Sequence, residues 1–135
     1  MTDTTNDLTG RIALVTGASR GLGAATARAL AARGADVVLT YRKRAEEAEA
    51  VAEQVRASGR RAWLFQCELG EEDSIAGLLE AAAADPGRVD ILVANAAATS
   101  FRPLMQAERR HVERTFAISV TGFLQLVQGV VPLMP

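Results

Sequence analysis

The residues between positions 16 and 23 have the types and spacing of a phosphate-binding turn. They read Thr-Gly-Ala-Ser-Arg-Gly-Leu-Gly and lie between a β-branched run and an alanine-rich segment. Glycines let a backbone approach a ligand closely, and the N–H groups at a helix start favour anions. The pattern G-x-x-x-G-x-G at such a junction favours a dinucleotide site over an ordinary tight turn. We expect this turn to bind the cofactor through Gly17, Ser19, Arg20, Gly21, Leu22 and Gly23.

The residues after the second predicted strand bear on the choice between NAD and NADP. A ribose 2′-hydroxyl is normally held by an acidic residue about 20 positions after the glycines. Here the chain reads Tyr41, Arg42, Lys43 and Arg44 instead. No carboxylate would repel a 2′-phosphate there, and Arg42 together with Arg20 is suited to bind one. We therefore predict NADP(H) in preference to NAD(H), with Tyr41 and Arg42 in the site. The alternative is a solvated basic start of a helix.

These motifs lie in a strict alternation of short apolar strands and amphipathic helices. The predicted strands are residues 11–16, 36–40, 61–67 and 89–94, and the predicted helices are residues 24–33, 44–58, 71–84 and about 106–134. Such alternation implies right-handed crossovers and a parallel sheet. We predict an α/β, doubly wound Rossmann fold with strand order 3-2-1-4, in which ligands bind at the carboxyl ends of the strands.

Composition indicates an ordinary globular domain with a small-molecule partner. The chain has 135 residues, 49% hydrophobic content and a net charge of -1, from 15 basic and 16 acidic residues. This balance gives no electrostatic footprint for nucleic acid or an anionic membrane, so we expect neither as a partner. We expect residues 1–10 to form a polar tail and residues 11–135 to form one dinucleotide-binding domain.

Several other features are not expected. The single cysteine, Cys67, precludes an internal disulfide and fits a reducing cytoplasm, and the polar start is unlike a signal peptide. We therefore expect a cytoplasmic protein. No apolar run approaches the roughly 18 residues of a membrane span. The ligand cluster of a metal site is absent, and we expect the sole histidine, His111, to be an exposed helix residue without a catalytic role.

A run of small residues after the fourth predicted strand completes a family pattern. Asn95-Ala96-Ala97-Ala98 leaves room for a flat ligand over the strand ends. With the turn at residues 16–23, it makes the chain resemble the short-chain dehydrogenase/reductase family. There the first turn reads T-G-x-x-x-G-x-G, and strand four leads into N-N-A-G. The resemblance implies that Asn95, Ala96 and Ala97 line the cofactor site. It also places Glu68 at the position of a family aspartate that contacts adenine, and Leu69 at the position that follows it.

The resemblance covers the whole chain as the N-terminal half of such a protein, and it implies where catalysis occurs. Ser119, in Ile118-Ser119-Val120-Thr121-Gly122, occupies the position of the asparagine in the family's catalytic tetrad. Because its hydroxyl is able to bind a water, Ser119 is our candidate catalytic residue. The family's catalytic serine and Tyr-x-x-x-Lys would follow Pro135. We therefore expect the chain alone to be inactive, and to exist as a homo-oligomer or paired with its C-terminal half.

The function implied by the resemblance is hydride transfer between NADP(H) and a carbonyl, alcohol or enoyl substrate. Asn95-Ala96-Ala97 with Arg102-Pro103 is similar to the enoyl-thioester reductase branch, while a 3-oxoacyl reductase fits equally well. Two other classes stay open. One is a non-catalytic nucleotide-binding module, consistent with Ser119, and the other is one half of a split chain.

Overall fold

A four-stranded parallel sheet forms the centre of the chain. The computed structural model describes residues 7–98 and 101–135, so residues 1–6 of the predicted tail lie outside the described part. The strands are β1 (Ile12–Val15), β2 (Asp36–Tyr41), β3 (Ala62–Gln66) and β4 (Ile91–Val93). Their order in the sheet is β3-β2-β1-β4, and every neighbouring pair is parallel. The predicted strand order is confirmed.

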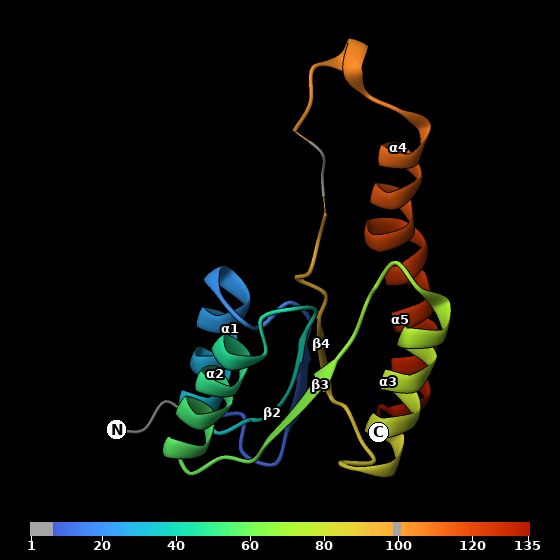
Figure 1. Ribbon diagram of the computed structural model, residues 1–135. Coiled ribbons are helices and arrows are strands. Elements are labelled where there is room, and N and C mark those ends of the chain that lie inside the picture. Colours follow the sequence, from blue (N-terminus) through green and yellow to red (C-terminus); the bar gives the residue numbers. More distant parts are fainter. Residues whose placement is uncertain (1–6, 99–100) are drawn as a thin grey trace.

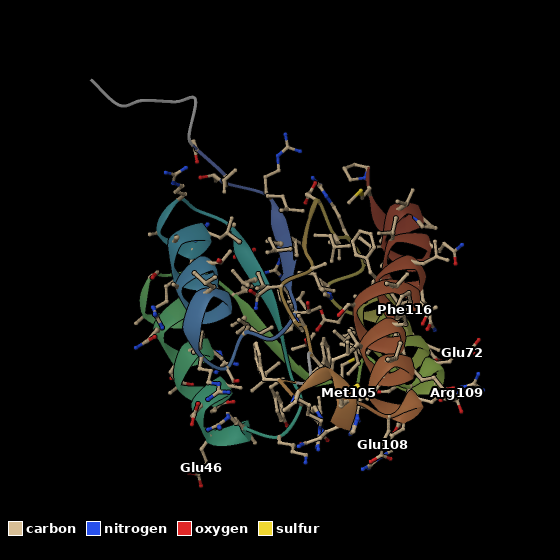
Figure 2. The ribbon with its side chains drawn as sticks, turned by 90° about the horizontal axis from the view of Figure 1, so that it is seen from above. Glu46, Glu72, Met105, Glu108, Arg109 and Phe116 are labelled. Atoms are coloured by element: carbon tan, nitrogen blue, oxygen red, sulfur yellow. The ribbon has the colours of Figure 1, made fainter. Side chains whose placement is uncertain are left out.

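Helices cover both faces of this sheet, as a doubly wound fold requires. One layer holds α1 (Gly21–Ala32) and α2 (Ala45–Ala57), and the other holds α3 (Glu72–Ala84) and α5 (Gly122–Val130), as Figure 1 shows. In the view from above, Glu46 of α2 and Glu72 of α3 lie on opposite sides of the molecule (Figure 2).

Alternation along the strands builds the two hydrophobic cores. Val15, Val37 and Leu39 pack with the alanines of α1 and with α2, whereas Leu14 and Val38 belong to the core on the other face. All five of these strand side chains are fully buried. Strands buried on both faces read as continuous apolar runs, which is the pattern seen in this sequence.

The final helical segment is continuous from Arg109 to Leu133 but changes its winding along the way. It comprises α4 (Arg109–Phe116), a π-helical turn (Ala117–Thr121), α5 and a 3-10 turn (Val131–Leu133). The predicted start near residue 106 was about three residues early. Leu104–Gln106 is a separate 3-10 turn, and Glu108 caps α4 by a capping box in which its N–H donates to Nδ1 of His111 at 3.0 Å.

This segment is also long and apolar enough to cross a membrane, judged by length and composition alone. It has 25 residues, and its most apolar 18-residue window reaches a mean hydropathy of 1.6. The expectation that no apolar run approaches this length is therefore wrong. After the charged start of the segment, which includes Arg110 and Glu113, the polar residues that interrupt it, such as Ser119 and Gln125, are few and uncharged. Core helices meet the same criterion but are mostly buried, whereas 22% of this window is buried, with Leu126 and Val130 of α5 on the side that packs against α3.

Candidate functional site

A cavity of about 570 Å³ lies at the carboxyl ends of the strands. Its volume is within the range of small-molecule and cofactor sites. The predicted cofactor residues that line it are Gly17, Ser19, Arg20, Gly21, Tyr41, Arg42, Glu68, Leu69, Asn95, Ala96 and Ala97. The remaining lining residues, which the sequence did not single out, are Thr40, Lys43, Arg44, Cys67, Ala98 and Ile118. The structure thus brings together residues from four separate loops.

Two predicted residues of the glycine turn do not line this cavity. Leu22 is 79% exposed, and Gly23 is buried behind the turn. A Cβ on Gly23 would lie 2.1 Å from the carbonyl oxygen of Gly17, so only glycine fits there. Gly17 itself has a φ of 65°, a conformation that favours glycine. Gly23 therefore supports the site by close packing and does not face a ligand in the cavity.

The start of α1 offers backbone donors at the cavity. The first N–H groups of an α-helix have no acceptor within the helix. Arg20 is the N-cap residue, and its side chain makes no capping hydrogen bond. The first turn, beginning at Gly21, borders the cavity. These N–H groups and the positive end of the helix dipole are arranged to bind a phosphate group.

Asn95 braces the glycine turn against the end of β4. Its Nδ2 donates to the carbonyl oxygens of Thr16 and Gly17, both at 3.1 Å. The N–H of Ala96 donates to Oγ1 of Thr16, also at 3.1 Å, and Thr16 is fully buried. Thr16 was not among the predicted functional residues, although it directly precedes the first glycine of the motif. These bonds fix the backbone that forms one wall of the cavity.

Four cationic side chains line the cavity, and only two of them are paired within residues 7–98 and 101–135. Nε of Arg42 donates to Oε2 of Glu68 at 2.6 Å, and Nη1 of Arg44 donates to Oε1 of Glu47 at 2.9 Å. Arg20 and Lys43 form no ion pair with any described residue. The cavity therefore carries an excess of positive charge, which suits a phosphorylated ligand.

A smaller cavity of about 140 Å³ adjoins the first and contains Ser119. Asn95, Ala96 and Ala97 line both cavities, and Thr16 and Phe123 also line the second. Ser119 lies in the π-helical turn and is exposed. The candidate catalytic residue thus shares a cavity with predicted cofactor residues, among them the small side chains of Ala96 and Ala97. Its hydroxyl is placed where it is able to hold a water or a ligand oxygen.

Cys67 and His111 also carry chemically reactive side chains, but the surroundings of each indicate a structural role. Burial raises the pKa of the Cys67 thiol, which keeps the thiol protonated at neutral pH. His111 is partly buried, contrary to the expected exposed position, because its Nδ1 closes the capping box at the start of α4. In the part of the chain that the structure describes, no group of three or more metal-ligating side chains occurs.

Comparison with known proteins assigns this architecture to one family. The family model described as short chain dehydrogenase matches residues 11–135. An uncharacterized oxidoreductase of Methylorubrum extorquens is 40% identical over 122 residues, which make up 90% of this chain and 49% of that protein. The chain spans about half the length of the curated relatives it matches.

Solved structures agree with this assignment. A short chain dehydrogenase from Burkholderia cenocepacia in complex with NADP is 37% identical, with a TM-score of 0.91 over 96% of this chain and 53% of that chain. A 3-oxoacyl (acyl-carrier-protein) reductase from Agrobacterium tumefaciens with NADP bound is 36% identical, with a TM-score of 0.89 over 99% of this chain and 52% of that one.

Proposed function

Because the chain belongs to the short-chain dehydrogenase family, we propose that it is the cofactor-binding part of an NADP(H)-dependent oxidoreductase. The reaction is hydride transfer to or from a carbonyl, an alcohol or an enoyl substrate. The observation that carries this proposal is the single cavity that unites the start of α1 with Arg20, Arg42 and Lys43. Two related proteins that were solved with NADP support the choice of cofactor.

The charges around the cavity favour a 2′-phosphate over a free ribose hydroxyl. Tyr41 ends β2, and Arg42 and Lys43 follow it, so no carboxylate occupies the usual position of a ribose-binding acid. Glu68 is the sole acidic residue among the described residues that line the cavity, and it is already paired with Arg42. A phosphate group at this edge would meet cations on several sides.

The residues of this chain bind and orient the cofactor. The bound nicotinamide ring supplies or accepts the hydride. The first turn of α1 binds the pyrophosphate, and the small side chains of Ala96 and Ala97 leave space for a flat ring beside β4. Ser119 lines the adjoining cavity, where its hydroxyl would hold a water near these alanines. Orientation of the reacting groups is the contribution expected from such a binding half.

A titration comparing NADPH with NADH tests this proposal. We expect the unmutated protein to bind NADPH more tightly, and Arg42→Asp to reverse this order because the new carboxylate repels a 2′-phosphate and accepts from a ribose hydroxyl. Arg28→Asp is the matched control, since Arg28 is exposed on α1 and pairs with Gln54 outside the cavity. Equal or tighter NADH binding by the unmutated protein would contradict the proposal.

A second candidate is a nucleotide-binding module without catalysis. It is favoured by Ser119, which stands at the position where the related family has a catalytic asparagine. NADPH oxidation by the full-length protein, measured with a 3-oxoacyl thioester and with an enoyl thioester, separates the alternatives. Consumption of one thioester identifies a reductase and its substrate class. Tight NADPH binding with neither thioester consumed, and with Ser119→Asn also inactive, favours the module.

A further inference from the structure

Arg42 and Glu68 form an ion pair inside the proposed cofactor cavity. They follow β2 and β3, which are neighbours in the sheet with Tyr41 opposite Gln66. Nε of Arg42 donates to Oε2 of Glu68 at 2.6 Å, and the two side chains are 46% and 26% exposed. The residues are 26 positions apart, so only the parallel pairing of the strands brings them together.

The backbone around this pair is held by several hydrogen bonds. The N–H of Glu68 donates to Oγ of Ser74 at 2.8 Å, which ties the end of β3 to the first turn of α3. The N–H of Cys67 donates to the carbonyl oxygen of Tyr41 at 2.9 Å. Nε2 of Gln66 donates to the carbonyl oxygen of Arg42, also at 2.9 Å. The backbone that carries Glu68 and Arg42 is therefore held in place at the ends of both strands.

The bond to Glu68 uses Nε of Arg42, which leaves the terminal nitrogens of the guanidinium group for a ligand. A guanidinium group presents its N–H donors in a rigid fork that matches a phosphate in a bidentate manner. An exposed arginine loses side-chain freedom when it binds a ligand. An arginine that is already held by a carboxylate loses less, so its ligand binds more tightly.

We propose that Glu68 is a positioning residue that holds Arg42 for the 2′-phosphate and thereby sets the preference for NADPH over NADH. This inference rests on the proposed NADP(H) site. It differs from the adenine contact that the family resemblance implies for this position, because the carboxylate is engaged by Arg42. The negative charge of Glu68 does not exclude a phosphate, because Arg20, Arg42 and Lys43 all line the same cavity.

Two nucleotides that differ by one phosphate test the proposal. Adenosine 2′,5′-bisphosphate and adenosine 5′-monophosphate are titrated by calorimetry into the unmutated protein and into Glu68→Ala. We expect Glu68→Ala to weaken binding of the bisphosphate about tenfold, as for the loss of a charge-assisted hydrogen bond, and to leave the monophosphate nearly unchanged. Glu68→Gln keeps an acceptor for Nε and should restore most of the affinity. Glu53→Ala, which removes an arginine-paired carboxylate outside the cavity, is the matched control.

The same titrations in an Arg42→Ala background show whether Glu68 acts through Arg42. We expect Glu68→Ala to have no further effect there. Equal weakening of both nucleotides, or weakening that persists without Arg42, would show an adenine contact and overturn the proposal. Tighter binding of the bisphosphate by Glu68→Gln would show that the carboxylate only repels the phosphate, which also overturns it.

The affinities of the unmutated protein for the two nucleotides show whether this inference or the proposed function has failed. If it does not prefer the bisphosphate over the monophosphate, the proposed NADP(H) site is wrong. If it does, and Glu68→Ala keeps the full preference, only the positioning role of Glu68 is wrong. Melting temperatures of all variants show whether they are folded. Should Glu68→Ala fail to fold, Glu68→Leu replaces it, because leucine keeps the bulk of the side chain and offers no acceptor to Nε of Arg42, and the same loss of about tenfold is expected.

Discussion

Glycines in the glycine turn contribute by lacking a side chain, which allows neighbouring atoms to pack closely. Gly23 lies on the side of the turn away from the cavity, and an added Cβ there would meet the carbonyl oxygen of Gly17 at 2.1 Å and Nδ2 of Asn95 at 2.7 Å. The same amide of Asn95 supports the turn through two hydrogen bonds. A change at Gly23 therefore reaches the cavity wall through Asn95.

Gly23→Ala should weaken both the fold and nucleotide binding. We expect a loss of stability of about 1–3 kcal/mol, because the neighbouring atoms are backbone and a packed amide that have little room to move. Gly77→Ala is a control with the opposite expectation. Its Cβ would meet nothing within 4 Å in the middle of α3, so the substitution should stabilise the chain by about 0.5–1 kcal/mol.

Thermal unfolding and NADPH titration of both variants check this pair. An unchanged melting temperature and affinity for Gly23→Ala would contradict the role of close packing in the turn. A lower melting temperature for Gly77→Ala would show that an added Cβ lowers stability even where it causes no steric clash.

Most residues that line the cavity could be predicted from the sequence, but the pairing of their side chains could not. The glycine motif, Tyr41, Arg42 and Asn95 follow from their positions at strand ends, because parallel strands end at a common edge. The Arg42–Glu68 pair depends on the register of β2 against β3, which the apolar pattern of one buried and one partly buried strand does not determine. Lys43 was not included because the sequence offers no reason to separate it from a solvated helix start.

At the scale of elements, Asp90 fastens the beginning of β4 to the beginning of β1. Its side chain is 4% exposed and accepts from Nη2 of Arg88 at 2.6 Å. It also accepts from the N–H of Ile12 at 2.9 Å, next to the backbone bond from the N–H of Asp90 to the carbonyl oxygen of Ile12. Burial alone would raise the pKa of Asp90, but the hydrogen bonds from Arg88 and Ile12 outweigh it and lower the pKa.

Asp90→Asn should destabilise the chain by about 1.5–3 kcal/mol at neutral pH, since it weakens hydrogen bonds to a charged group. Because the folded-state pKa is lowered, the contribution of Asp90 is fully present above its unfolded pKa of about 3.9. It is lost as the pH falls through the lower folded-state value. The difference in unfolding free energy between Asp90→Asn and the unmutated chain should therefore shrink in acid.

Urea unfolding at neutral pH and at successively lower pH measures this difference. Glu80→Gln is the control, because it makes the same kind of change at an exposed residue of α3. An Asp90→Asn difference that stays constant into acid would show that the carboxylate charge contributes nothing to stability.

The order of the elements was predictable from periodicity, but the local winding of the last helix was not. Strand and helix positions follow from buried apolar runs and amphipathic repeats. The π-helical turn at Ala117–Thr121 leaves the apolar repeat nearly unchanged, so hydropathy alone does not reveal it. The capping box at Glu108 uses His111 in place of the usual glutamate or glutamine, and this is why the start of α4 was placed too early.

At the scale of the whole molecule, the long helix has one covered face and one open face. Leu126 and Val130 are buried on the side of α3 and the sheet. Large apolar side chains spaced along the rest of the segment are 49–57% exposed, among them Phe116, which is labelled in Figure 2. Five of these residues are here called the open face: Val112, Phe116, Val120, Phe123 and Leu124. Apolar patches of this kind on a folded chain mark contact surfaces.

We expect the 135-residue chain to self-associate through the open face at low micromolar concentration. Covering the exposed half of each side chain contributes up to about 1.5 kcal/mol, and five such side chains on each of two copies are enough to oppose the entropy lost on association. Val120→Glu should shift the chain toward monomer, because a carboxylate in an apolar interface is costly to bury. Since Val120 is half exposed in the single chain, the substitution should leave the folded structure intact.

Sedimentation velocity over a range of concentrations, with circular dichroism of each variant, checks this expectation. Ala57→Glu adds the same charge at an exposed position of α2, away from the open face, and should leave the association unchanged. If the unmutated chain sediments as a well-folded monomer throughout, the open face is stable in water and the expectation is wrong. If it associates but Val120→Glu associates equally, the contact surface lies elsewhere on the molecule, and the half-exposed side chains of the long helix are not what holds the copies together.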